Sequence, residues 1–316
     1  MQAVMYDRFG DHSVLSVREV PTPQAARGQV QVRVRMASLN PVDFKLRSGI
    51  LRMLGRPKRP AITGKDFAGE ITALGPQVQG FTLGQRVFGS VDPMGGQGSC
   101  AQFVAIATDL VAPTPEGLSD EVAASLPVAS GSALQALTGI ARLQRGQSIL
   151  ITGASGAVGA SAVQLAASIG ARVTGVCGTA NIDYVRSLGA ESVIDYSAGD
   201  WTQLGQRFDV IFDAAAAASF AQARPLLASQ GIYINTMPRP ALYWAALIAR
   251  ASSNQRCVPF LLKTDAALLQ RLGKLAAERV IVPHIHEIID LTQVASAQRR
   301  MQQGKVHGKV CVRVDA

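Results

Sequence analysis

A glycine-rich loop is the clearest chemical feature of the sequence. Gly153, Gly156 and Gly159 recur at every third position, between a β-like run at Ser148–Thr152 and an Ala-rich helical run at Ala157–Ile169. Glycines at this spacing permit a tight turn and let backbone N–H groups approach a pyrophosphate, while the following helix contributes its positive end. A glycine turn without a ligand is the alternative. We expect a dinucleotide here, held by Ala154, Ser155, Gly156, Ala157, Val158 and Gly159.

The end of the next β-like run, Arg172–Val176, bears on which dinucleotide binds. Proteins that bind NAD usually place Asp or Glu there to hold the ribose 2′-hydroxyl, but residues 177–181 contain no acid and the first one is Asp183. An acid would repel a 2′-phosphate, whereas Thr179 and Asn181 can donate hydrogen bonds to it. The sequence therefore predicts NADPH, with NADH as the alternative, at a site that includes Cys177, Gly178, Thr179 and Asn181.

No set of metal ligands is evident. The cysteines form no Cys-x-x-Cys pair, which disfavours a zinc ribbon or a dense disulfide framework and is simplest to reconcile with a reducing, cytoplasmic compartment. His284 and His286 form a His-x-His pair without an evident third ligand, so we interpret them as part of a surface strand. The four cysteines are Cys100, Cys177, Cys257 and Cys311.

The helices and strands that must position these residues show two different sequence patterns. In the first third, Gln29–Leu39 alternates apolar and polar residues, which is typical of a half-buried strand. Three further short apolar runs are separated by Gly and Pro clusters, and together they indicate a compact, mostly antiparallel domain. These runs are Gly69–Leu74, Arg86–Phe88 and Ala101–Ile106.

The middle of the chain alternates β-like and helical runs, which predicts βαβ units and a parallel sheet. Expected strands beyond those named are Ser192–Ile194, Phe208–Phe212 and Gly231–Asn235, and expected helices are Ile182–Leu188 and Ser219–Ala228. Further helices are expected at Ala241–Ala251, Asp265–Ala277 and Thr292–Gln303, and a final strand at Lys309–Val314 is expected to return to the first domain. The fold class is therefore α/β.

Composition excludes several classes of protein. The chain has 316 residues, of which 48% are hydrophobic and 17% charged, so it contains enough apolar material for a buried core and is not disordered. Residues 1–10 lack the apolar stretch of a signal peptide, and the longest uncharged runs are broken by Gly, Pro and polar residues. We expect a soluble, cytoplasmic protein.

The formal net charge of +9 favours anionic ligands. Part of it comes from one segment between Asp43 and Asp66, which holds seven cations and no acid. The segment is interpreted as a solvated loop, with two alternatives: attraction of an anionic substrate or lipid surface, and nucleic-acid binding. No nucleic-acid partner is expected, and peripheral membrane contact is not expected either. The cations are Lys45, Arg47, Arg52, Arg56, Lys58, Arg59 and Lys65.

Several ordered motifs resemble one family from end to end: the zinc-independent, zeta-crystallin-like quinone oxidoreductase branch of the medium-chain dehydrogenase/reductase superfamily, close to its alcohol dehydrogenase and enone reductase members. The resemblance implies a GroES-like, β-rich catalytic domain at 1–118 and 258–316, a Rossmann domain at 119–257, and a homodimer, often formed by edge pairing of Rossmann sheets. The motifs are 39–45 (LNPVDFK), 64–69 (GKDFAG), 125–127, 131–137, the glycine loop, 188–190, 193–196 (VIDY) and 308–310.

The resemblance also implies roles for single residues. Asn40 should hydrogen-bond near the nicotinamide or its ribose, Ser132 should lie near the same ring, and Tyr196 should pack by the 2′-phosphate. Ala214, Thr236 and Met237 complete the expected cofactor site. Two positions depart from the family pattern: Ala180 stands where a Lys or Arg is common, which weakens the NADPH prediction, and Cys100 stands where a Tyr is common.

The chemistry that fits these residues is hydride transfer from NADPH to a quinone or an α,β-unsaturated carbonyl compound. Lys65 and Asp66 occupy the stretch where zinc-dependent relatives have His and Glu, so no zinc is expected. Lys45 is the candidate donor to a developing enolate, the alternative being a solvated lysine or a partner of Asp43. Candidate walls of the acceptor site are Phe44, Leu51, Leu54, Cys100, Tyr243 and Phe260.

Two other functions remain open. One is an enoyl reductase for a substrate bound to CoA or to a carrier, which the basic segment would suit. The other is a non-catalytic protein that senses NADPH through the Rossmann fold. The glycine loop and Asn40 favour an enzyme.

Overall fold

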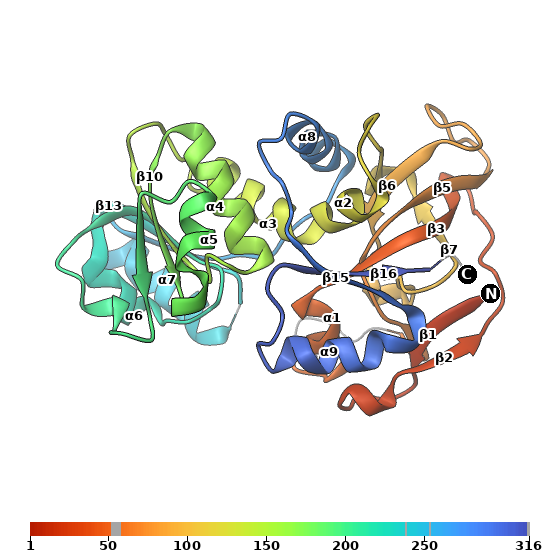
Figure 1. Ribbon diagram of the computed structural model, residues 1–316, viewed down its shortest axis with the longest axis horizontal. Helices are drawn as coiled ribbons and strands as arrows, with labels where there is room; N and C mark the ends of the chain where they lie inside the picture. Colours follow the sequence, from red (N-terminus) through yellow and green to blue (C-terminus); the bar gives the residue numbers. More distant parts are fainter. Residues whose placement is uncertain (52–57, 238, 253, 315–316) are drawn as a thin grey trace. The chain divides into compact units, whose positions relative to one another are not determined.

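The computed structural model describes residues 1–51, 58–237, 239–252 and 254–314, and these divide into two compact units. Unit 1 comprises residues 1–131 and 264–316, and unit 2 comprises residues 132–263. The predicted fold class is confirmed: one unit is rich in antiparallel strands and the other contains a parallel sheet (Figure 1).

Unit 1 contains two sheets. The smaller has the order β2-β1-β4, and the larger has the order β15-β16-β3-β5-β6-β8, with β7 also paired to β3. The strands are β1 (Gln2–Tyr6), β2 (Ser16–Glu19), β3 (Gln29–Leu39), β4 (Ala61–Ile62), β5 (Asp66–Leu74), β6 (Arg86–Ser90), β7 (Phe103–Ala107), β8 (Val111–Pro113), β15 (Ile285–Asp290) and β16 (Lys309–Arg313). The helices are α1 (Pro41–Arg47), α2 (Asp120–Ser125), α8 (Ala266–Ala277) and α9 (Val294–Gln302), with α3 (Gly131–Leu134) at the junction of the units.

Alternation along β3 explains the core of unit 1. Val30, Val32 and Val34 are completely buried, whereas Arg33 between them is exposed, as the period of two requires. The C-terminal strand β16 pairs antiparallel with β3, with Val310 opposite Leu39, so the prediction that the chain end returns to the first domain is confirmed (Figure 1).

Unit 2 is a six-stranded parallel sheet in the order β11-β10-β9-β12-β13-β14, which is the doubly wound order 3-2-1-4-5-6. The strands are β9 (Ser148–Thr152), β10 (Arg172–Cys177), β11 (Ser192–Asp195), β12 (Phe208–Asp213), β13 (Leu227–Asn235) and β14 (Arg256–Pro259). The helices are α4 (Ala157–Ile169), α5 (Ile182–Ser187), α6 (Phe220–Ala223) and α7 (Pro240–Ser252).

One predicted helix is shorter than expected. The sequence predicted a helix over Ser219–Ala228, but α6 ends at Ala223, a 3-10 turn follows at Arg224–Leu226, and β13 begins at Leu227. Pro225 lies in that turn, and a proline has no N–H for a helical hydrogen bond. The chain therefore leaves the helix here and enters the sheet.

The two units also divide at other positions than the sequence suggested. Residues 119–131 belong with unit 1, because α2 packs against β3 and β5. Strand β14 is paired with β13, Cys257 opposite Tyr233, so a boundary at 257/258 would cut through the parallel sheet. Among the described residues, no helix is both long and apolar enough to cross a bilayer.

Candidate functional site

The glycine loop forms the turn that the sequence predicts between β9 and α4. Gly153 has φ +60°, a conformation that favours glycine. A Cβ on Gly159 would lie 2.1 Å from the carbonyl oxygen of Gly153, and one on Gly156 would lie 3.3 Å from it. The loop backbone therefore packs so closely against the first turn of α4 that only glycine fits at residue 159, and we call this loop the glycine cradle. It lies at the N-terminus of a 13-residue helix. These residues fit a pyrophosphate.

The predicted loop contacts differ in exposure. Ala154 and Gly159 are buried, and the N–H of Ala154 donates to the carbonyl of Val176 at 3.0 Å. The half-buried residues of the loop are Ser155, Gly156, Ala157 and Val158. Neighbouring strands β10 and β12 flank β9 on either side, so the loop stands at the point where the strand order reverses.

The segment after β10 lies where the sequence expected the adenosine ribose. Cys177 is buried, Thr179 is exposed, and Gly178 and Asn181 are half-buried. Tyr196 is 61% exposed, and its hydroxyl would lie 3.1 Å from a Cβ on Gly178. The structure thus brings Tyr196 to this segment from the end of β11.

An acid reaches the same place from β11, and the sequence reading missed it. In the parallel pairing, Asp195 lies opposite Cys177, and its Oδ2 accepts a hydrogen bond from the Thr179 hydroxyl at 2.5 Å. The segment 177–181 has no acid of its own, yet a carboxylate stands beside it. The position of Asp195 beside this segment depends on the register of β10 and β11. The residue itself belongs to the motif 193–196.

A second residue that the sequence reading missed, Asp213, is the hub at the end of β12. Its carboxylate accepts hydrogen bonds from the hydroxyls of Thr152 (2.5 Å) and Tyr233 (2.7 Å) and from the side-chain amide of Asn235 (3.0 Å). It also accepts from the backbone N–H groups of Ala217 (2.9 Å) and Ala218 (3.1 Å). Burial raises the pKa of Tyr233, and the charge of Asp213 raises it further. Asp213 therefore holds the 214–218 loop against the ends of β9 and β13.

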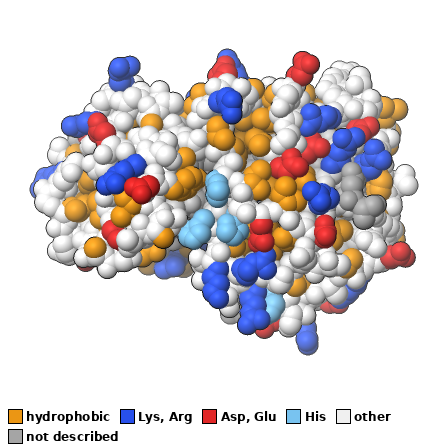
Figure 2. All heavy atoms as spheres, in the orientation of Figure 1, with side chains coloured by type: hydrophobic (Ala, Val, Ile, Leu, Met, Phe, Trp, Pro, Cys, Tyr) orange, Lys and Arg blue, Asp and Glu red, His pale blue; other side chains and the backbone are white. Residues whose placement is uncertain are grey.

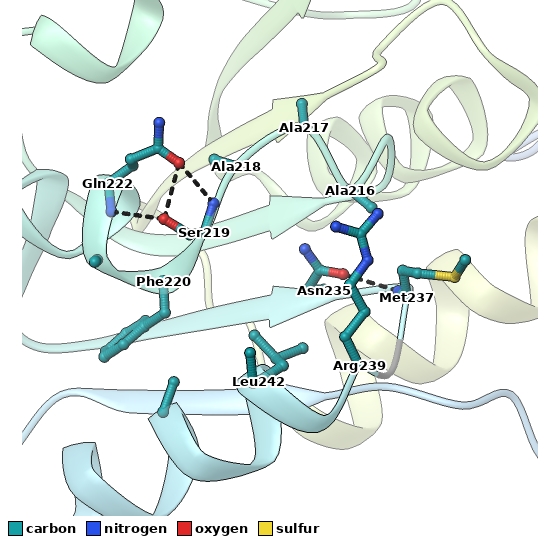
Figure 3. Close-up of a pocket in the computed structure, with 13 residues that line it drawn as sticks. Ala216, Ala217, Ala218, Ser219, Phe220, Gln222, Asn235, Met237, Arg239 and Leu242 are labelled. Atoms are coloured by element: carbon teal, nitrogen blue, oxygen red, sulfur yellow. Dashed lines mark hydrogen bonds between the residues drawn. The ribbon is translucent and has the colours of Figure 1, made fainter. Parts of the chain in front are cut away.

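This loop borders a pocket of about 470 Å³ within unit 2. Figure 3 shows Arg239 beside Asn235 and Met237, and the Met237 N–H donates to the Asn235 side chain at 2.8 Å. Of the predicted cofactor residues, Met237 lines the pocket, and Ala214 is joined to Thr236 by a hydrogen bond from the threonine hydroxyl at 3.1 Å. The pocket thus lies at the carboxyl ends of β12 and β13, where sheets of this kind bind ligands.

In unit 1, Asn40 is the centre of a buried polar cluster. Its Oδ1 accepts a hydrogen bond from Lys309 Nζ at 2.8 Å, and its Nδ2 donates to Asp66 Oδ2 at 2.9 Å. Lys309 Nζ lies 3.6 Å from the same Asp66 oxygen, which also accepts from the Val128 N–H at 3.1 Å. Asn40 is only 2% exposed. Both ends of its amide are therefore used inside unit 1, and Asn40 holds α1, β5 and β16 together.

The sequence analysis gave Lys309 no role of its own and included it only in the motif 308–310. Its place at the start of the last strand was the signal that could have identified it. In the structure Val310 pairs with Leu39, and because the strands are antiparallel the residue before Val310 lies beside the residue after Leu39, which is Asn40. The interpretation of Asp66 as an acid that hydrogen-bonds backbone agrees with its bond from Val128.

Helix α1 begins at this cluster and carries the candidate donor Lys45. Asp43 Oδ2 accepts from the Asn40 N–H at 2.7 Å, which closes a capping box. Burial raises the pKa of Asp43 to about 7, and the charge of Asp66 adds to this, while the Asn40 bond and Lys309 oppose it. Lys45 lies in the last turn and is half-buried.

The interpretation of the basic segment as a solvated loop is wrong for Arg47. This side chain is completely buried rather than solvated. It donates to the carbonyl of Gly10 at 2.7 Å and to the side chains of Gln298 (2.8 Å) and Gln302 (3.2 Å), so it fastens α1 to α9. Residues 52–57, with Arg52 and Arg56, lie outside the described residues.

The candidate wall residues fall into three groups. Phe44 and Leu51 are half-buried in unit 1, and Tyr243 is 52% exposed in unit 2. Cys100 (0% exposed) and Phe260 (4%) are core residues, which corrects their assignment to a ligand surface. Burial raises the pKa of the Cys100 thiol well above its usual value, as expected of a small apolar filler. Leu54 lies outside the described residues. Ser132, which the sequence predicted near the nicotinamide, is buried at the start of unit 2.

The histidines form no metal site in the described ranges. His284 and His286 are exposed, as predicted for a surface position, and the His286 and His307 rings are 6.3 Å apart. Figure 2 shows histidine side chains at the surface on the drawn face of the molecule. Across residues 1–51, 58–237, 239–252 and 254–314, no three His, Cys, Asp or Glu side chains cluster to hold a metal.

Comparisons with known proteins cover the whole chain. Residues 26–116 match the family described as alcohol dehydrogenase GroES-like domain, and residues 188–312 match the family described as zinc-binding dehydrogenase. The chain is 33% identical to the chloroplast envelope quinone oxidoreductase homolog of Arabidopsis thaliana, over 99% of this chain and 98% of that protein.

Two further likenesses concern a structure and a second activity. The solved quinone oxidoreductase from Coxiella burnetii has a TM-score of 0.91 and 30% identity, and covers 100% of this chain and 99% of that one. The NADPH-dependent alkenal/one oxidoreductase of Arabidopsis thaliana is 32% identical over 68% of this chain and 57% of that protein.

Proposed function

Because this chain belongs to the quinone oxidoreductase family of the medium-chain dehydrogenase/reductase superfamily, we propose that it reduces a quinone or an α,β-unsaturated carbonyl compound with NADPH. The observation that carries the proposal is the glycine cradle between β9 and α4, in which a Cβ at Gly159 has no room. The names of the relatives, which include a quinone and an alkenal/one oxidoreductase, support the two acceptor classes.

The cofactor residues are those of unit 2. When bound, NADPH supplies a hydride. The half-buried loop residues bind the pyrophosphate, the 177–181 segment and Tyr196 bind the adenosine ribose, and Asp213 orients the 214–218 loop beside the pocket near Met237. Ser132, Ala214 and Thr236 remain proposed members of the site.

In unit 1 we assign different roles to the two residues that the sequence singled out. Asn40 acts as a positioning residue, since its amide is bound to Lys309 and Asp66 and it caps the helix that carries Lys45. Lys45 is the proposed donor to an enolate oxygen, and Phe44, Leu51 and Tyr243 remain proposed wall residues. A quinone needs less help, because its oxygens can take protons from water.

The reaction is proposed to need no zinc, since Lys65 and Asp66 stand in place of the metal-ligand stretch and Asp66 is bound to Asn40. The compartment is proposed to be the cytoplasm, because the four cysteines include no Cys-x-x-Cys pair and are buried without forming disulfides.

Oxidation of NADPH at 340 nm tests the function. The acceptors are 1,4-benzoquinone, 9,10-phenanthrenequinone, a 2-alkenal and crotonyl-CoA, with NADH in parallel. We expect turnover of a quinone or the alkenal. Turnover of crotonyl-CoA alone would favour the enoyl reductase, and binding of NADPH without turnover would favour the sensor. If neither cofactor binds, the proposal is wrong.

We also propose that the protein is a homodimer formed through unit 2. Helix α7 packs Leu242, Ala245, Ala246 and Ala249 against the core of unit 2. Its other large apolar residues are outside: Tyr243, Trp244, Leu247 and Ile248 are 52–66% exposed. The helix packs along β14, the strand at the end of the sheet. An exposed apolar face beside a sheet edge supports a second copy as its cover.

Sedimentation equilibrium tests the dimer. We expect wild type at twice the monomer mass and Leu247→Glu shifted toward the monomer, because a charge would be buried in the interface. Leu83→Glu is the control, since Leu83 is 65% exposed in unit 1. A wild type that stays monomeric at micromolar concentration, or a Leu83 variant that dissociates equally, would contradict the proposal.

A further inference from the structure

The adenosine end of the proposed cofactor site contains the carboxylate of Asp195, which lies outside the segment 177–181 in the sequence. Strands β10 and β11 run parallel, so their carboxyl ends lie at the same edge of the sheet, and Asp195 is opposite Cys177. Its Oδ2 accepts from the Thr179 hydroxyl (2.5 Å) and its Oδ1 from the Ser197 N–H (2.8 Å). Asp195 thus lies beside the end of the second strand, within hydrogen-bond distance of Thr179, although it belongs to the neighbouring strand.

Asp195 is negatively charged at neutral pH. The hydrogen bonds from Thr179 and Ser197 lower the pKa of its carboxyl, and its charge contributes, after burial, to the raised pKa of the Cys177 thiol. The surrounding sequence brings no compensation: residues 187–206 contain no Lys or Arg but three acids, and residues 173–185 contain no Lys or Arg either. Arg186, between these stretches, is 3.4 Å from Asp183.

The bond to Asp195 also changes what Thr179 offers a ligand. A threonine hydroxyl has one proton, and Thr179 gives it to Asp195. The sequence reading expected Thr179 to donate to a 2′-phosphate, but in this arrangement only its lone pairs face a ligand. A ribose 2′-hydroxyl can donate to Asp195, whereas a 2′-phosphate meets a like charge.

We propose that Asp195 is a specificity-determining residue that limits discrimination in favour of NADPH, so that the protein binds NADH as well. The inference rests on the proposed use of a nicotinamide dinucleotide and deepens it. Tyr196 and Asn181 remain proposed contacts for either adenosine end, and residue 180 is an alanine that adds no positive charge beside Asp195.

The test uses isothermal titration of the whole protein with four probes: NADP⁺, NAD⁺, adenosine 2′,5′-bisphosphate and AMP. Asp195→Asn keeps an acceptor for Thr179 and removes the charge. We expect the affinity ratio of NADP⁺ to NAD⁺, and of the bisphosphate to AMP, to rise about five- to tenfold in this variant. The affinity for AMP should change less than the affinity for the bisphosphate.

Asp200→Asn is the matched control. It removes one charge from the same segment, where Asp200 is exposed and accepts from the Thr202 N–H and hydroxyl. Its ratios should stay near those of wild type. If wild type binds the probes and Asp195→Asn leaves the ratios unchanged, or Asp200→Asn shifts them equally, the inference is overturned while the proposed function stands. If wild type binds neither NADP⁺ nor NAD⁺, the proposed function fails and the inference with it.

Discussion

Replacing Lys309 with methionine is expected to lower the free energy of unfolding by about 3–5 kcal/mol. Lys309 and Asp66 are 2% and 0% exposed, and Lys309 Nζ also donates to Asn40. Without the ammonium group, the Asp66 carboxylate would remain buried without its cation, and its Oδ1 already lacks a hydrogen-bond partner. The cost comes from the stranded charge rather than from a lost contact alone. Urea unfolding followed by far-UV circular dichroism measures it.

A double variant separates this cause from a packing defect. Lys309→Met combined with Asp66→Asn removes both charges and keeps an acceptor for the Asn40 and Val128 groups. We expect it to be more stable than Lys309→Met alone, by at least about 1 kcal/mol. Lys305→Met, at an exposed lysine of the same segment, should change stability by less than about 0.5 kcal/mol. Equal losses at Lys309 and Lys305 would sink the argument.

Gly159→Ala is expected to weaken dinucleotide binding by at least about tenfold, equivalent to about 1.4 kcal/mol. The added Cβ would lie 2.1 Å from the Gly153 carbonyl oxygen and 2.8 Å from the Ala154 Cα. Both are backbone atoms, so the loop must move away from the N-terminus of α4. The dinucleotide then loses the N–H groups that the turn aims at it. Quenching of NADPH fluorescence measures the affinity.

Two other glycines grade the effect. A Cβ at Gly156 would lie 3.3 Å from the Gly153 oxygen, so Gly156→Ala should weaken binding less. Gly205→Ala is the control in the same unit, since nothing lies within 4 Å of its Cβ and its φ is ordinary. If Gly159→Ala binds NADPH as Gly205→Ala does, the cradle does not hold the cofactor. Thermal unfolding of each variant separates loss of the site from loss of the fold.

Local patterns were enough to predict most elements. The strand Gln29–Leu39, the strand Ser148–Thr152 and the helix Ala157–Ile169 have the predicted bounds, because alternation and glycine spacing are properties of neighbouring residues. The helix predicted over Ser219–Ala228 is too long, because Pro225 lies in the turn that ends the helical stretch and Leu227 pairs with β12 in the sheet.

The α/β class, the glycine loop and the family could be predicted from residues that are neighbours along the chain, because periodicity and contiguous motifs are local properties. Which polar groups meet could not be predicted in this way and depends on the fold. Lys309 reaches Asn40 across 269 residues, because antiparallel pairing of β16 with β3 sets the register. The parallel register of β10 and β11 brings Asp195 to Thr179. The side chain of Arg47, although it belongs to the basic segment, is buried and bound to Gln298. Strand register and long-range burial are collective properties of the folded chain, and they place the charges on which stability and cofactor choice are proposed to depend.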